Sequence, residues 1–302
     1  MLISHRRHAL PSEAVTLELD RVVFPDWVFR RAYVEGVIQD ERLTTSVLGR
    51  GAPSERSRLV VSLEGSVTVF ALGRVVELGA GEALIARRLD DLTIRAGAGH
   101  SFEMDWAPTG ELAASTCGEL DHAKLGKTTL AAIADMSRAM REAATATVPI
   151  LLDAAEAATQ ALRFEGLPFD ARAIREPRAA LACPGMQQLT DALDTELSEL
   201  HLGPALGTVE DRLGCSRRTV ARRIREVHAR YGISALTGAD WRSARDFYRL
   251  LLGTILASHP AVTTNRLARM LGYSSPAALC HAFANAGLPS PTALGELARN
   301  AA

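Results

Sequence analysis

The chain changes character near residue 121, and this change limits the folds it can adopt. Before it, short β-branched or apolar runs alternate with glycine turns, as in RLVVSLEG, SVTVFALG and RVVELGAG. Runs of this length predict an antiparallel sandwich or barrel. After it, Ala, Leu, Glu and Arg dominate and β-branched runs vanish. The sequence therefore predicts an α+β chain with a β-rich first half followed by helices.

Apolar spacing predicts helices at residues 130–144 and 149–166, with Gly166 as the stop of the second. A three-proline linker follows at 167–185, and another amphipathic helix at 186–200. On the helix predicted at residues 149–166 we expect one buried face made of Ile150, Leu151, Ala154, Ala158, Ala161 and Leu162.

Length and composition exclude several classes. The 302 residues allow about two domains, and 47% hydrophobic residues can form a core. No apolar run approaches the roughly 18–20 residues of a membrane span, and the first residues lack the apolar stretch of a signal peptide. The four cysteines are widely spaced and form no CxxC pair. We expect reduced thiols and a cytoplasmic location.

Charge is distributed unevenly along the chain. The formal net charge is −1, yet the residues from 205 onward carry 13 arginines, no lysine and 6 acids. Their net charge is therefore 13 − 6 = +7, which leaves −8 for the rest of the chain. Such asymmetry is expected when one segment meets a polyanion and the other does not, although an idle basic surface is the alternative.

A first helix pair is predicted around a turn at Gly214. Ser216 stands where an N-cap belongs, ahead of a helix whose inward face is Val220, Ile224 and Val227. Five arginines within nine positions repel one another without a partner, whereas arginine in a major groove pairs bidentately with guanine. The helix therefore predicts a DNA contact, chiefly through the first three of its arginines, against the alternative of a solvated face. These five arginines are Arg217, Arg218, Arg222, Arg223 and Arg225.

A second helix pair is predicted closer to the C-terminus. Its first helix should start at Thr263 or Thr264, its turn should fall at Gly272, and Ser274 or Ser275 should cap the second helix. The joint core of the two helices is expected to be Leu267, Ala268, Leu271, Leu279 and Phe283.

These motifs resemble a known family. The stretch from Ala268 to Pro291, with Leu-Gly-Tyr, Ser-Ser-Pro and a final Ser-Pro, resembles the second helix-turn-helix of the AraC/XylS transcription regulators. The first pair is similar to the upstream unit of that domain, and residues 239–258 to its connecting helix, about 25 Å long. The resemblance covers roughly residues 186–302 and implies two recognition helices in successive major grooves, about 34 Å apart.

The motifs and the resemblance together name the candidate DNA contacts. The second recognition helix is almost uncharged, with His281 its sole candidate cation. We therefore predict unequal halves, in which the first helix reads bases and the second docks on phosphate. The candidate DNA-binding residues are Ser216, Arg217, Arg218, Thr219, Arg222, Arg223, Tyr273, Ser274, Ser275, Ala277 and His281.

Residues 58–88 resemble the cupin-type sensor barrel found ahead of many AraC domains. Enzymatic cupins hold a metal with clustered histidines, whereas His100 is the only histidine between residues 9 and 121. We expect His100 to be a turn residue. The chain also has no GxSxG, GxxxxGKS/T or strand-linked GxGxxG motif, so we expect no metal, no cofactor and no enzymatic activity. Four aromatic residues either line a pocket or fill the barrel, with filling favoured: Trp27, Trp106, Phe70 and Phe102.

The predicted fold class is α+β multidomain. A cupin-like β-barrel sensor spans 1–120, a helical dimerisation or linker segment spans 121–185, and an all-α AraC-type DNA-binding domain with two helix-turn-helix motifs spans 186–302. The expected function is sequence-specific transcription regulation, controlled by a small molecule or partner.

The expected partners are double-stranded DNA, a small-molecule effector, a second copy of the chain and RNA polymerase, with no membrane. Two alternatives remain open. One is a ligand-independent DNA-binding protein whose barrel only oligomerises, and the other is a cupin-type enzyme with a helical appendage.

Overall fold

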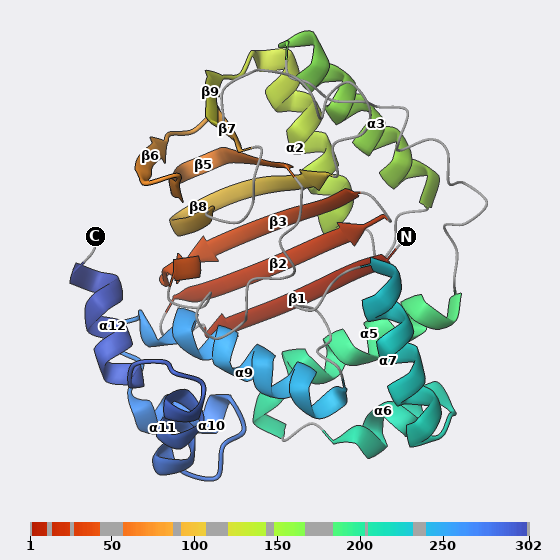
Figure 1. Cartoon of the computed structure of the whole chain (residues 1–302), viewed down its shortest axis with the longest axis vertical. Coiled ribbons are helices and arrows are strands. Elements are labelled where there is room, and N and C mark those ends of the chain that lie inside the picture. Colours follow the sequence, from red (N-terminus) through yellow and green to blue (C-terminus); the bar gives the residue numbers. More distant parts are fainter. Residues whose placement is uncertain are drawn as a thin grey trace.

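The protein has a central sheet with helices on two sides (Figure 1). On one side lie α2 (Lys127–Arg141) and α3 (Val148–Phe164), and on the other lie the helices formed by residues 184–300. No described helix is both long and apolar enough to cross a membrane. The computed structural model describes residues 2–10, 14–24, 27–42, 57–86, 92–106, 120–142, 148–166, 184–202, 205–231 and 240–300.

The sheet is antiparallel at every strand pair described. Its strand order is β1-β2-β3-β8-β5-β7-β9, while β4 pairs with β8 and β6 pairs with β5. The predicted antiparallel N-terminal half followed by helices is confirmed. The strands are β1 (Leu2–Leu10), β2 (Val15–Val23), β3 (Trp27–Glu35), β4 (Gln39–Asp40), β5 (Ser57–Ala71), β6 (Arg74–Leu78), β7 (Glu82–Ala86), β8 (Thr93–Trp106) and β9 (Leu120–Lys124).

Alternate residues of the strands enter different cores because side chains alternate across a sheet. Leu59 of β5 joins the core under α2 and α3, whereas its neighbour Val60 joins an apolar cluster on the opposite face. Aromatic filling is confirmed for Trp27, Trp106 and Phe102, which all belong to the core under α2 and α3. The indole rings of Trp27 and Trp106 stack with centroids 6.0 Å apart.

The expected buried face of α3 is confirmed at Leu151, Ala158 and Leu162 but was wrong at Ile150, which is 52% exposed. A second expectation about this half was wrong. His100 is not a turn residue. It lies within the continuous strand β8, where its Nε2 is 2.8 Å from the hydroxyl of Ser137 on α2. Strands β5 and β8 stay paired on both sides of His100, and the pairing changes register there instead of ending in a turn.

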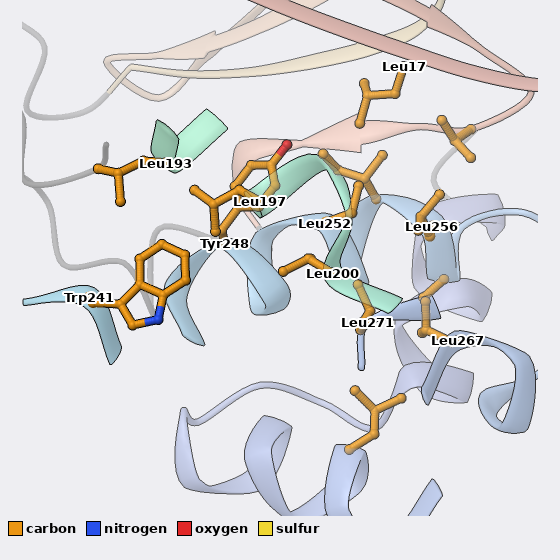
Figure 2. Close-up of a cluster of buried hydrophobic side chains, with 14 of the residues drawn as sticks. Leu17, Leu193, Leu197, Leu200, Trp241, Tyr248, Leu252, Leu256, Leu267 and Leu271 are labelled. Atoms are coloured by element: carbon orange, nitrogen blue, oxygen red, sulfur yellow. The ribbon is translucent and has the colours of Figure 1, made fainter. Parts of the chain in front are cut away.

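The C-terminal helices pack on the other side of the sheet through one apolar core. Figure 2 shows Leu17 of β2 facing Tyr248 and Leu252. The expected stop at Gly166 and the expected helix near 186–200 are both found. The elements are α5 (Pro184–Ser198), η3 (Leu200–Leu202), α6 (Leu206–Leu213), α7 (Arg217–Tyr231), α9 (Trp241–Ala257), α10 (Thr264–Met270), α11 (Pro276–Asn285) and α12 (Pro291–Asn300).

Helix α5 docks on the outer edge of β1 through hydrogen bonds of its side chains. The Gln187 amide accepts from the Ile3 backbone N–H at 2.9 Å and donates to the Ile3 carbonyl at 2.8 Å. Asp194 accepts from the His5 backbone N–H at 2.9 Å and from Nε of Arg6 at 2.8 Å. Helix side chains thus satisfy edge groups that would otherwise be unpaired.

Two half-buried histidines should make stability fall in mild acid. Burial, reinforced by the Arg6 charge, lowers the pKa of His8 to about 4, and burial with the Arg31 charge does the same for His100. The unfolded chain, with histidine pKa near 6.5, binds more protons below that pH. Stability is therefore complete above pH 6.5 and is lost as pH falls toward 4.

We expect a loss on the order of 1–2 kcal/mol per histidine between pH 7 and pH 5. The measurement is the urea midpoint at both pH values for the unaltered protein, His8→Gln and His122→Gln. His122 is an exposed histidine on β9 and serves as the control. A pH dependence that His8→Gln leaves unchanged would contradict the assignment.

Candidate nucleic-acid interface

The first helix pair is built around a left-handed glycine. Helix α6 ends at Gly214, whose φ is 58° and ψ 34°, and the N–H of Cys215 closes the turn on the Glu210 carbonyl. The Ser216 carbonyl accepts the first helical bond of α7 from the Val220 N–H, so Ser216 occupies the N-cap position. The predicted turn and helix start are both confirmed.

The inward face of α7 is the one the sequence predicts. Val220, Ile224 and Val227 are at most 1% exposed and belong to the core that also contains Leu189 and Leu193 of α5. This packing fixes which side of α7 faces solvent.

The arginines of α7 divide into three environments. Arg217, Arg218 and Arg225 are exposed, with Arg217 and Arg218 in the first turn. Arg222 is exposed and ion-paired with Glu226 one turn later. Arg223 is half-buried, and its guanidinium carbon lies 3.7 Å from where a β-carbon on Gly185 would stand, at the start of α5. The two arginines best placed for a groove are therefore Arg217 and Arg218.

Thr219 and Ser216 support the start of α7 rather than extend from it. Thr219 is half-buried, and its hydroxyl lies 3.2 Å from that of the exposed Ser216. This hydroxyl pair spans the first turn of α7, where the first backbone N–H groups of a helix have no partner within the helix.

The second helix pair repeats the design with different caps. The Thr263 hydroxyl accepts from the Arg266 N–H at the start of α10, and the Ser275 hydroxyl accepts from the Ala278 N–H at the start of α11. Gly272 makes the turn with φ of 69°. The five predicted core residues Leu267, Ala268, Leu271, Leu279 and Phe283 are all at most 1% exposed.

The candidate contacts of the second unit are mostly uncharged surface. Ser274, Ala277 and His281 are exposed. Tyr273 is half-buried, and the guanidinium of Arg249 lies 5.2 Å from its ring centroid. Burial raises the pKa of Tyr273 and keeps its hydroxyl protonated. Tyr273 and Ser275 thus have structural partners within the unit itself.

Two cations of this unit escaped the sequence reasoning because they lie on α10 and not on a recognition helix. Arg269 is exposed and Arg266 half-buried, and both line a cleft against β1. Their i, i+3 spacing on one helix face was the available signal.

Helix α9 connects the two units. Asp240 caps it by accepting from the Ser243 N–H at 2.9 Å, and its 17 residues span about 25 Å. The predicted connecting helix is confirmed. Figure 1 shows α6 and α7 beside one end of α9 and α10 to α12 near the other. A β-carbon on Gly253 of α9 would lie 2.9 Å from the Phe283 ring, so α9 and α11 are in close contact.

The two turn glycines should differ in their tolerance of alanine. Alanine at Gly272 would bring a β-carbon to 2.2 Å from the Leu200 carbonyl oxygen, in addition to the left-handed φ. At Gly214 the same β-carbon meets nothing within 4 Å, so only the left-handed strain of about 1 kcal/mol remains. Gly272→Ala should therefore lower the thermal midpoint clearly more than Gly214→Ala in calorimetry. Equal shifts would show that the Leu200 contact is unimportant.

A metal site needs three or four ligand side chains. The described residues contain no group of three or more His, Cys, Asp or Glu side chains able to hold a metal ion. Cys215 and Cys280 are free thiols, while Cys117 and Cys183 lie outside the described residues.

The arrangement defines a helical domain with two helix-turn-helix units joined by one helix. No family model and no curated protein matches the chain. Among solved structures, ToxT from Vibrio cholerae is similar at 9% identity and a TM-score of 0.32, over 89% of this chain and 92% of that one. The AraC-like transcriptional activator CuxR is similar at 15% identity and a TM-score of 0.32, over 80% of this chain and 89% of that one.

Protein YlbA from E. coli is similar at 12% identity and a TM-score of 0.27, over 40% of this chain and 49% of that one.

Proposed function

We propose that this chain is a sequence-specific DNA-binding transcription regulator of the AraC/XylS type, acting in the cytoplasm and without enzymatic activity. The observation that carries the proposal is the surface of α7. A glycine-turned helix pair presents Arg217 and Arg218 in the exposed first turn of its second helix, while the opposite face is buried. This is the geometry by which a helix-turn-helix places arginine against base edges.

Helix α11 supplies the second contact in this proposal. Its N-terminus is capped by Ser275, and exposed Ser274 precedes it. Helix N-termini attract phosphate through their free N–H groups and dipole, so an uncharged helix is sufficient for a backbone contact. The two units therefore act unequally, α7 on bases and α11 mainly on phosphate, with His281 in a minor role.

The N-terminal sheet completes the proposal as a cupin-like module that receives a small-molecule or protein signal. Its connection to the DNA-binding helices is direct, because β1 is bonded to Gln187 and Asp194 of α5. Helices α2 and α3 lie on the opposite side of the sheet, and in this proposal they pair two copies of the chain. A dimer would raise apparent DNA affinity through effective concentration.

The test is selection of bound fragments from random duplex DNA by the full chain. We expect an enriched motif with two parts about 10 base pairs apart, one strongly and one weakly specified. Affinity for that motif should fall linearly in log–log form as salt rises. Recovery of unenriched DNA, or of a motif that depends on neither α7 nor α11, would overturn the proposal.

A further inference from the structure

A second feature of the molecule is a cleft of about 630 Å³ between the sheet and the C-terminal helices. One wall is the last four residues of β1, from Arg7 to Leu10. The floor includes Leu252 and Leu256 of α9, and the facing wall is α10 with Arg266 and Arg269. The cleft is separate from the exposed face of α7.

The wall formed by β1 is an edge that α5 leaves uncovered. Strand β1 pairs only with β2 among the described strands, and their register is unbroken from Leu2 to Leu10. The outward backbone groups belong to alternate residues of such an edge. Ile3 and His5 bond outward to α5, so the same alternation directs the backbone groups of Arg7 and Ala9 outward into the cleft.

The described residues give these outward groups no partner. No described hydrogen bond involves the backbone N–H of Arg7 or Ala9 away from β2, and Ala9 is exposed. A free edge of this kind is a template for pairing with another strand. Half of β1 is thus covered by α5, and half is open beside an apolar floor.

The charge of the cleft selects its occupant. Its lining, as described, contains no acidic residue, while it contains Arg266, Arg269 and His201. The Arg7 guanidinium is paired with Asp20 at 2.6 Å, whereas Arg269 of α10 is exposed, so Arg269 is the arginine most accessible to an occupant. A second copy of β1 would bring no carboxylate to this basic wall, since its sequence from Leu2 to Leu10 contains no acid, which disfavours self-pairing.

We propose that the cleft binds an extended acidic peptide of a partner protein, which adds a strand to the open half of β1. Its main chain pairs with Arg7 and Ala9, its carboxylates face Arg266 and Arg269, and its alternate apolar side chains lie on Leu252 and Leu256. Main-chain pairing supplies affinity in this recognition mode, and alternate side chains supply specificity. The partner would contact β1 and the second DNA-binding unit at the same time.

The first arm of the test uses the unaltered full chain and a fluorescein-labelled, N-acetylated Glu-Val-Glu-Val-Glu peptide, followed by anisotropy. Two derivatives carry N-methyl groups on complementary sets of alternate amides. When the valine side chains lie on the floor, only one of the two sets of amides points toward β1. Methylating that set removes the hydrogen bonds to β1, so one derivative should bind about tenfold more weakly than the parent peptide and the other about equally. Equal binding of both, or no binding of the parent, would overturn the proposal.

The second arm changes the edge itself. Ala9→Pro removes an outward N–H, which an edge strand tolerates, and should weaken the parent peptide about tenfold. Ala9→Val keeps the N–H and should bind like the unaltered protein. Arg269→Glu should weaken the peptide and leave a Lys-Val-Lys-Val-Lys peptide no weaker than before.

Small carboxylates are the competing occupant. If octanoate displaces the peptide and Ala9→Pro leaves peptide binding unchanged, the cleft is a site for small anions, and the strand-pairing proposal is wrong. Neither arm of the test contains DNA, so a negative result for peptide binding does not bear on the proposed function. The peptide series also decides the matter if Ala9→Pro does not fold.

Discussion

Replacing Arg217 and Arg218 together with alanine is expected to weaken binding to a selected DNA site by about 100-fold or more. A bidentate arginine–guanine contact is worth about 1–3 kcal/mol of discrimination, and two such residues lie exposed in the first turn of α7. The measurement is fluorescence anisotropy at fixed salt with the selected site and with a scrambled duplex. The loss should be much larger on the selected site, because base contacts carry specificity.

Single substitutions separate the two units. Arg218→Ala should cost at least tenfold, whereas His281→Ala should cost less than about threefold, since α11 is expected to act through its N-terminus. Arg74→Ala is the matched control, because this arginine is exposed on β6 and belongs to neither helix-turn-helix unit nor to α2 or α3. A loss at His281→Ala equal to or larger than that at Arg218→Ala would show that the second unit, and not the first, reads the bases.

The second large effect concerns stability and not DNA. Asp194→Ala is expected to destabilise the protein by about 3–5 kcal/mol, because it leaves Arg6, which is only 4% exposed, without its carboxylate. The same change leaves the edge N–H of His5 without its acceptor. Burial by itself would lower the pKa of the Arg6 guanidinium. Its attraction to Asp194 and to Tyr248 outweighs burial, so the pKa is raised above its ordinary value.

Urea unfolding at neutral pH measures this loss, and Glu199→Ala is the control. Glu199 is an exposed acid just after the end of α5, and its removal should cost less than about 1 kcal/mol. Replacing both buried partners, as Arg6→Met with Asp194→Leu, should recover most of the stability lost by Asp194→Ala. A loss below about 1 kcal/mol for Asp194→Ala would mean that β1 is not held by α5.

Much of the candidate site could be predicted because its signals are local. A serine or threonine ahead of a helix forms its cap through bonds that span only three residues, as Thr263 and Ser275 do. Gly214 and Gly272 mark turns because only the left-handed region closes them. The inward face of α7 follows from helical spacing alone, as Val220, Ile224 and Val227 confirm.

Other features escaped prediction because they depend on how distant segments meet. The buried face of α3 is rotated away from Ile150, since apolar spacing defines a stripe but not the neighbour that covers it. His100 looked like a turn residue, yet β8 continues through it in a ladder with register shifts. The functional assignment of the α7 arginines was made from their type, whereas their division into exposed, ion-paired and half-buried members needed the packing of α5.

The sequence by itself determined the order of the elements, their caps and turns, and the basic character of the last hundred residues, because those properties depend on neighbours within a few positions. Only the tertiary structure decided that β1 is clamped by α5, across a separation of 189 residues between His5 and Asp194, and that the rest of that edge stays open beside α10. Edge coverage depends on where rigid elements meet in space, and no local pattern of residues encodes that meeting.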